Sequence, residues 1–97
     1  MNLIGNFTKA PGETTPYTVL YSDDLEAGDT VNAAAATVDG DALLIIDYVI
    51  FTNDPTLGPF AKVMLSGGTS GTKYTVTVTS KSVAGRVMID TFTVTIR

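Results

Sequence analysis

The sequence contains no cysteine, no histidine and no tryptophan. Without cysteine there is no disulfide framework and no thiolate nucleophile, and without cysteine and histidine the usual zinc sites are excluded. The absence of histidine also removes the side chain that most often transfers protons near neutral pH. Most hydrolytic and redox chemistry is therefore excluded, and we expect no enzymatic activity, no catalytic residue, no cofactor and no metal centre.

Charged residues are scarce, and long hydrophobic runs are absent. Charged side chains make up 16% of the 97 residues and hydrophobic ones 44%, a composition typical of a folded domain. The longest apolar run, residues 42–51, contains Asp47 and is too short to span a bilayer. Residues 1–6 have neither a basic segment nor an apolar run of signal-peptide length, so we expect no cleaved leader. A chain of this length predicts a single domain over residues 1–97.

The net charge of -4 argues against nucleic acid as a partner, because nucleic-acid binders usually carry a basic face. The charges are unevenly distributed: residues 1–54 hold one base and nine acids, whereas residues 55–97 hold five bases and one acid. Such a division could give one acidic and one basic surface, which would attract copies head to tail into a ring. Alternatively, strands from both halves interleave and the asymmetry averages out.

Alternation of apolar and hydroxyl side chains predicts antiparallel strands over 74–79 and 91–96, with alternate residues buried: Tyr74, Val76, Val78, Phe92, Val94 and Ile96. The connection 82–85 ends in glycine and predicts a hairpin between these strands. Residues 60–66 predict another strand with Ala61, Val63 and Leu65 on one face, separated from Tyr74 by a glycine-rich turn.

Four further strands are expected earlier in the chain, at 3–9, 16–21, 31–38 and 43–52. The alanines at 33–36 favour helix by propensity, but turn signals on both sides favour a strand. The apolar segment 43–52 predicts a strand that is buried on both faces for part of its length. About seven short strands with no long helix predict an all-β fold, an immunoglobulin-like antiparallel β-sandwich.

The acidic pairs Asp23/Asp24 and Asp39/Asp41 lie in apparent loops, where aspartate usually satisfies turn backbone groups. A glycosidase-like pair would need two acids that face a common cleft. Neither segment resembles the twelve-residue calcium loop, and a surface calcium site is the minor alternative to turn formation. The alternation of apolar and polar residues fails at Val87-Met88-Ile89, where both faces of the strand look apolar. Either a bulge shifts the register near Asp90, or a partner covers one face.

Three motifs in the C-terminal half form a glycine-rich hairpin, a turn and a final strand: LSGGTSGTKYTVT (65–77), SVAGR (82–86) and DTFTVTI (90–96). In these motifs the sequence resembles the small fibre-tail adaptor proteins of tailed bacteriophages. Lys9-Ala10-Pro11, Tyr17 and LEAGDTV (25–31) fit the family's opening. The chain departs from the family around 33–36, where the family often has a tryptophan after its GDTI strand.

This resemblance implies a virion structural protein, present in several copies or as a ring at the phage neck or tail, where it joins fibres to tail or connector proteins. Synthesis in the host cytoplasm would fit the absence of cysteine. We expect protein-interface residues at Val87 and Ile89, and an acidic loop of Asp23, Asp24 and Glu26 that faces a basic neighbour surface including Lys81 or Arg86. The alternative is a carbohydrate-binding or adhesive immunoglobulin-like module, for which only four tyrosines could supply stacking platforms.

Overall fold

The computed structural model describes residues 2–21, 25–40 and 43–97, with side chains described from Gly5 onward in those ranges. These residues form seven strands: β1 (Asn2–Lys9), β2 (Thr14–Leu20), β3 (Val31–Asp39), β4 (Leu44–Asp54), β5 (Gly58–Gly67), β6 (Lys73–Ser82) and β7 (Val87–Ile96). The part of the chain so described contains no helix. The expected all-β fold of about seven strands is confirmed.

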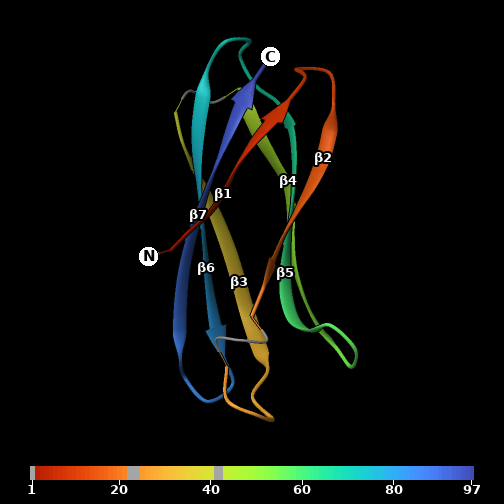
Figure 1. The fold of residues 1–97 in the computed structure, drawn as a ribbon, viewed down its shortest axis with the longest axis vertical. Helices are drawn as coiled ribbons and strands as arrows, with labels where there is room; N and C mark the ends of the chain where they lie inside the picture. Colours follow the sequence, from red (N-terminus) through yellow and green to blue (C-terminus); the bar gives the residue numbers. More distant parts are fainter. Residues whose placement is uncertain (1, 22–24, 41–42) are drawn as a thin grey trace.

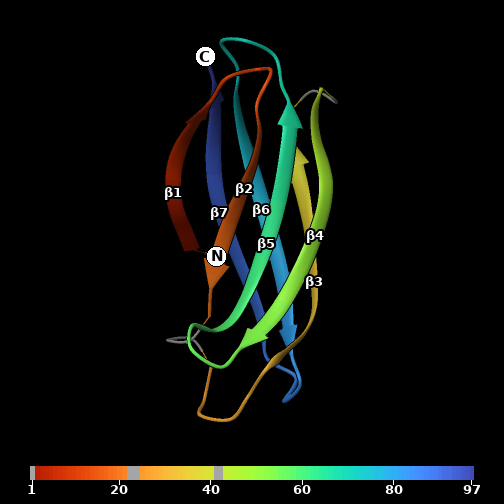
Figure 2. The same ribbon diagram turned by 90° about the vertical axis from the view of Figure 1, so that its right-hand side faces the viewer.

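The strands form two sheets that pack face to face (Figure 1). One sheet has the order β1-β7-β6-β3, and the other has the order β2-β5-β4 (Figure 2). Each sheet contains strands from both the acidic and the basic half of the sequence, so the two halves interleave. The predicted hairpin between β6 and β7 is present, with Ser82 N–H donating to the Arg86 carbonyl at 2.8 Å.

One strand pair departs from the antiparallel expectation, because β1 runs parallel to β7. The chain turns after β1 and enters the opposite sheet as β2, which leaves β1 to cover the edge of β7. The register of this pair shifts between Leu3 and Asn6. The remaining pairs, β2 with β5, β4 with β5, β3 with β6 and β6 with β7, are antiparallel.

The core lies between the sheets and contains the residues that the alternation predicts. Ala61, Val63 and Leu65 of β5 are fully buried. The alternate residues of the last two strands are buried as well, at Tyr74, Val76, Val78, Phe92, Val94 and Ile96. In β3 the alanines are strand residues, and Ala34 and Ala36 pack partly buried against this core. Tertiary packing therefore overrides the helical propensity of alanine.

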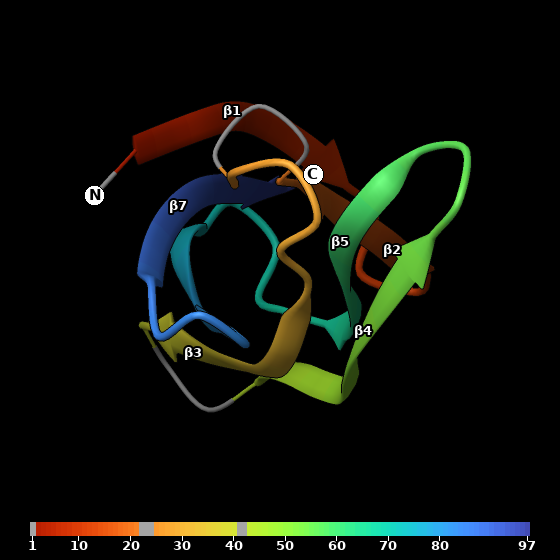
Figure 3. The ribbon, with the colours of Figure 1, turned by 90° about the horizontal axis from the view of Figure 1, so that it is seen from below.

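Side chains also tie one sheet to the other. Phe7 of β1 and Phe92 of β7 both contact Tyr17 of β2, with ring centroids 5.1 Å from that of Tyr17 in each case. Asn53 of β4 accepts a hydrogen bond from Val31 N–H at 2.9 Å and donates one to the Val31 carbonyl at 3.1 Å. Seen end-on, β3 and β4 lie together on one side of the sandwich (Figure 3).

The expectation that segment 43–52 is buried on both faces is wrong. β4 is an edge strand of its sheet, and only one of its faces meets the core. Leu44 is buried, whereas Ile45, Tyr48 and Ile50 are each more than 40% exposed. A strand formed by such an apolar run is buried on both faces only if other parts of the same chain pack against both of them. In this structure the chain packs against one face of β4.

Candidate interaction surfaces

The outer face of the four-stranded sheet presents the first two residues expected at an interface. Val87 is 56% exposed and Ile89 41%, whereas Met88 between them is buried. The β6–β7 register runs without a shift through this segment, so the bulge expected as one alternative near Asp90 is absent. Lys81 is exposed and pairs with Val87 across the two strands. Val87, Ile89 and Lys81 thus form one continuous, exposed area.

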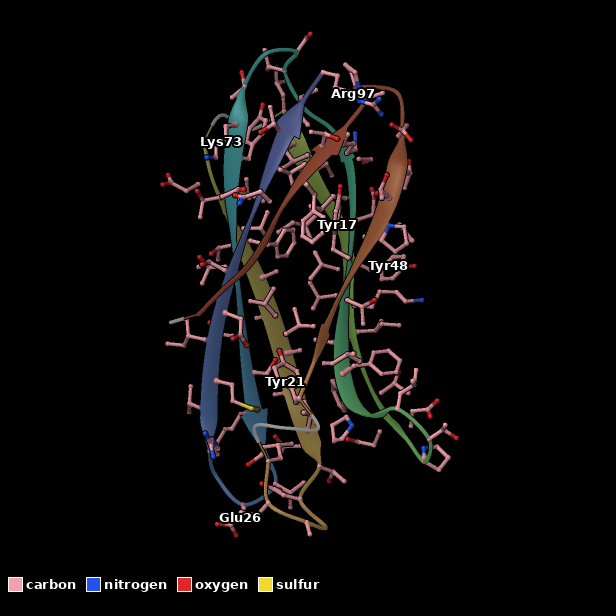
Figure 4. The ribbon with its side chains drawn as sticks, in the orientation of Figure 1. Tyr17, Tyr21, Glu26, Tyr48, Lys73 and Arg97 are labelled. Atoms are coloured by element: carbon pink, nitrogen blue, oxygen red, sulfur yellow. The ribbon has the colours of Figure 1, made fainter. Side chains whose placement is uncertain are left out.

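Glu26 and Arg86 lie at the same end of the sandwich, where the loop before β3 meets the β6–β7 turn (Figure 4 labels Glu26 at this end). They line an open cleft of about 500 Å³ together with Ala27–Thr30 and Val83. The sequence predicts Glu26 and Arg86 on surfaces that meet between molecules, whereas in the structure both line one cleft of a single chain. Asp23 and Asp24 lie outside the described residues.

Asp29 holds this end together. Its Oδ1 accepts hydrogen bonds from Thr30 N–H at 2.9 Å and from Ala84 N–H at 3.1 Å, while Val83 N–H donates to the Thr30 carbonyl at 2.8 Å. A hydrogen bond from the Ser82 side chain lowers the pKa of Asp29 most, and the two backbone donors and the Arg86 charge lower it further. The loop before β3 is therefore fastened to the β6–β7 turn. The sequence predicted only a turn at Asp29.

The outer face of the three-stranded sheet is a surface that was not predicted from the sequence. Its exposed or half-buried residues alternate with the core residues of the same strands. They include seven apolar side chains, which we call the β2-β5-β4 face: Pro16, Leu20, Ile45, Tyr48, Ile50, Phe60 and Met64. Figure 4 shows Tyr48 on this side of the sandwich. The available signal was that segment 43–52 is apolar at odd and even positions alike.

The aromatic residues give a sugar little to stack against. Tyr17, Tyr21 and Tyr74 are buried, and of the four tyrosines Tyr48 alone is exposed, at 43%. The Tyr21 and Ser80 hydroxyls are hydrogen-bonded to each other at 2.6 Å between the sheets. Three of the four stacking platforms considered for a carbohydrate-binding module are thus part of the core.

Within the described ranges, no group of three or more acidic side chains is arranged to hold a metal ion. The same residues contain no helix long and apolar enough to cross a membrane. Lys9 and Asp90 are both buried, and the Nζ of Lys9 donates to the Gly67 carbonyl at 2.7 Å and to the Ala10 carbonyl at 2.8 Å. Burial lowers the pKa of Lys9, an effect that the Glu13 charge partly offsets. Lys9 therefore ties the end of β1 to the end of β5.

Residues 9–97 match a protein family described as podophage GP4 fiber-tail adaptor protein gp77. The chain belongs to this fibre-tail adaptor family. The match includes the glycine-rich β5–β6 connection, the β6–β7 turn and both candidate surfaces. Membership in the adaptor family supports a structural role in the phage tail, with contacts to tail-fibre and tail proteins, and favours a non-enzymatic function.

No curated protein sequence is significantly similar to this member of the adaptor family. Among solved structures, one similar chain is described as "Solution Structure of Amebosin". The two chains are 14% identical, the TM-score is 0.46, and the alignment covers 99% of this chain and 91% of the other.

Proposed function

We propose that this protein is an adaptor at the phage neck or tail, which joins tail fibres to the tail or connector through protein–protein contacts alone. The observation that carries the proposal is the match of residues 9–97 to the fibre-tail adaptor family. The fold fits such a role, since a rigid two-layer body can hold neighbours on its outer faces. Synthesis in the host cytoplasm is part of the proposal and agrees with the lack of cysteine.

The proposal includes an immunoglobulin-like fold for the domain. In immunoglobulin-type sandwiches, the second strand pairs with the fifth and the fifth with the fourth, while the third, sixth and seventh strands form the other sheet. The strand orders β2-β5-β4 and β3-β6-β7 support this assignment. The parallel pairing of β1 with β7 then extends the second sheet by one strand.

We assign the contact with a neighbouring molecule to Val87, Ile89 and the adjoining Lys81. Two exposed β-branched side chains at alternate positions of a strand give an apolar strip that a partner can cover. Lys81 and Arg86 lie beside this strip and can pair with the acidic loop of a neighbour, to which Glu26, Asp23 and Asp24 belong. A contact between the Lys81 side of one copy and the acidic loop of the next is part of the proposal, and its repetition around an axis would give a homo-oligomeric ring.

Replacing Ile89 by Asp tests the proposed contact. Because Ile89 is 41% exposed, the isolated domain should keep its fold and lose less than about 1 kcal/mol of stability, as is usual for surface changes. Incorporation into phage particles should fall at least about tenfold, since a charge placed in an apolar contact costs more than 1.4 kcal/mol. Leu57→Asp is the matched control, because Leu57 is 56% exposed in the β4–β5 turn of the other sheet.

Normal incorporation of the Ile89→Asp protein would contradict the assignment of this contact. The charge argument has its own test, because exposed ion pairs weaken as salt shortens the Debye length from about 8 Å at physiological ionic strength. A ring that is indifferent to salt would contradict the role of the acidic loop. Binding to a glycan array, with no binding to tail proteins, would favour the adhesive alternative instead.

A further inference from the structure

The β2-β5-β4 face differs sharply from the outer face of the other sheet. Most of the corresponding outward positions of β6 and β7 carry hydroxyl side chains, and the apolar Val87 and Ile89 lie at one end of β7. The hydroxyl residues are Thr75, Thr77, Thr79, Thr91, Thr93 and Thr95, of which Thr91 and Thr93 are buried. On the three-stranded sheet the outward positions are mainly aliphatic or aromatic, with Ile45 52% and Leu20 53% exposed. Monomeric proteins rarely expose contiguous apolar areas of this kind unless another molecule covers them.

Two opposite charges interrupt this face, and their positions are related. Lys62 is half-buried in β5 between Phe60 and Met64. Asp47 is the extra residue where the β4–β5 register shifts, and its Oδ1 accepts a hydrogen bond from the Ser66 hydroxyl at 3.1 Å. Ser66 and Lys62 are each two residues from Met64, about 7 Å along the strand on either side of it, and the Asp47 carboxylate reaches across from β4 to the Ser66 hydroxyl.

The apolar residues follow the same symmetry. Tyr48 pairs with Met64, and these two residues form the central row of the face. Ile45 pairs with Ser66 on one side of this row, and Ile50 pairs with Lys62 on the other. Ile45 and Ile50 are thus each one outward-facing row away from the central row, on opposite sides of it.

We propose that the β2-β5-β4 face binds the same face of a second copy of this chain, about a two-fold axis that runs across the strands at the Tyr48–Met64 row. In a two-fold contact, residue i of one copy meets residue j of the other, and the reverse contact follows by symmetry. This axis brings Lys62 beside Asp47 of the second copy, and Ile45 beside Ile50 of the second copy. Tyr48 and Met64 each meet their own equivalents.

Charge complementarity selects a second copy as the occupant. Opposite charges placed equally far from a central row make the face its own complement, and the two-fold axis forms both ion pairs at once. A copy docked with its strands in the same direction would instead place Lys62 against Lys62, which costs free energy. The contact is independent of the proposed adaptor role, since Val87 and Ile89 lie on the opposite sheet.

A charge swap at Lys62 and Asp47, measured by sedimentation velocity over a wide concentration range, tests this dimer. The unchanged protein should associate reversibly into dimers. Lys62→Asp places two acids together and Asp47→Lys places two bases together, so each single variant should raise the dimer dissociation constant about tenfold or more. The double variant Lys62→Asp/Asp47→Lys should return the constant to within about threefold of the original value.

Rescue in the double variant points to a contact between molecules, because within one chain the backbone positions of residues 47 and 62 lie roughly 10 Å apart on neighbouring strands, with the Tyr48–Met64 pair between them. The matched control is Lys73→Asp/Asp39→Lys, which makes the same charge changes at exposed positions on the other sheet and should leave dimerisation unchanged. Circular dichroism checks that each variant is folded.

Three results would overturn the proposal: a monomer at every concentration, single variants that dimerise normally while folded, or a folded double variant that is not rescued. A monomer that still enters phage particles would show that the face is covered by another protein of the tail, and would leave the adaptor role intact. Dimerisation of the Ile89→Asp protein would show that the two contacts are separate.

Discussion

The glycine-rich connection between β5 and β6 allows a test of how much the stability of the fold depends on the backbone conformation of this connection. Gly67 and Gly71 both have positive φ, 75° and 82°, so an alanine at either position adopts an unfavourable backbone conformation. Their surroundings differ. A Cβ at Gly67 would lie 2.5 Å from the Leu43 carbonyl oxygen, whereas a Cβ at Gly71 would have no atom within 4 Å.

These differences give the expected magnitudes. Alanine in the left-handed region costs about 1–2 kcal/mol, and restriction of the unfolded chain returns about 0.4–1 kcal/mol, so Gly71→Ala should cost about 1 kcal/mol. At Gly67 the backbone must also move. That movement disturbs the 2.9 Å hydrogen bond from Gly68 N–H to the Leu43 carbonyl, and the 2.7 Å bond from Lys9 Nζ to the Gly67 carbonyl. Adding about 1 and about 2 kcal/mol for these bonds gives about 4 kcal/mol for Gly67→Ala.

Urea unfolding monitored by circular dichroism measures the difference. We expect an unchanged m value and a midpoint that falls much further for Gly67→Ala than for Gly71→Ala. The gap of about 3 kcal/mol corresponds to roughly 12–24 °C in Tm for a domain of this size. If the two variants lose the same stability within about 0.5 kcal/mol, the close approach of Gly67 to Leu43 is unimportant and the reasoning fails.

Two further predictions concern the core and the loop end. Phe92→Ala should lower the free energy of unfolding in urea by about 3–5 kcal/mol, because Phe92 is fully buried. A double-mutant cycle with Tyr17→Ala should give a coupling free energy of about 0.5–1.5 kcal/mol. A coupling of zero would contradict the ring contact between the sheets. Asp29 has a lowered pKa in the folded state, so its contribution to stability is present above its unfolded pKa near 3.8 and is lost as pH falls through the folded value. Asp29→Asn should therefore flatten the acid limb of a stability-against-pH curve, and an unchanged limb would refute this role.

The sequence predicted the strands that bury one face in the core and expose the other to water. In β6 and in residues 90–96 of β7, apolar residues alternate with polar ones, and Val76 and Val94 are buried as expected. The predicted inward face of β5, which includes Val63, is buried as well. β3 was predictable despite its alanines, because turn signals limit its length. The parallel partner of β1 was not predictable, since the alternation within a strand carries no information about its neighbour.

The outer surfaces were harder to predict because composition does not say which molecule covers a side chain. Ile45 and Ile50 look like core residues in the sequence, and their exposure appears only when β4 is placed at a sheet edge. Val87 and Ile89 left two interpretations open, and the continuous β6–β7 register removes the bulge. The hydrogen bond from Ala84 N–H to Asp29 joins segments 55 residues apart, and no local sequence pattern indicates that contact.

The place of β1 in the sheet has a consequence for biosynthesis. Among the described strands, β1 has β7 as its sole hydrogen-bonded neighbour, so β1 leaves the ribosome before the other six described strands and stays unpaired until β7 follows. Pairing between such distant segments is slow, because the connecting chain must first lose its freedom. A nascent or truncated subunit therefore cannot complete the four-stranded sheet. Such a subunit cannot present the complete outer face of that sheet to the growing particle.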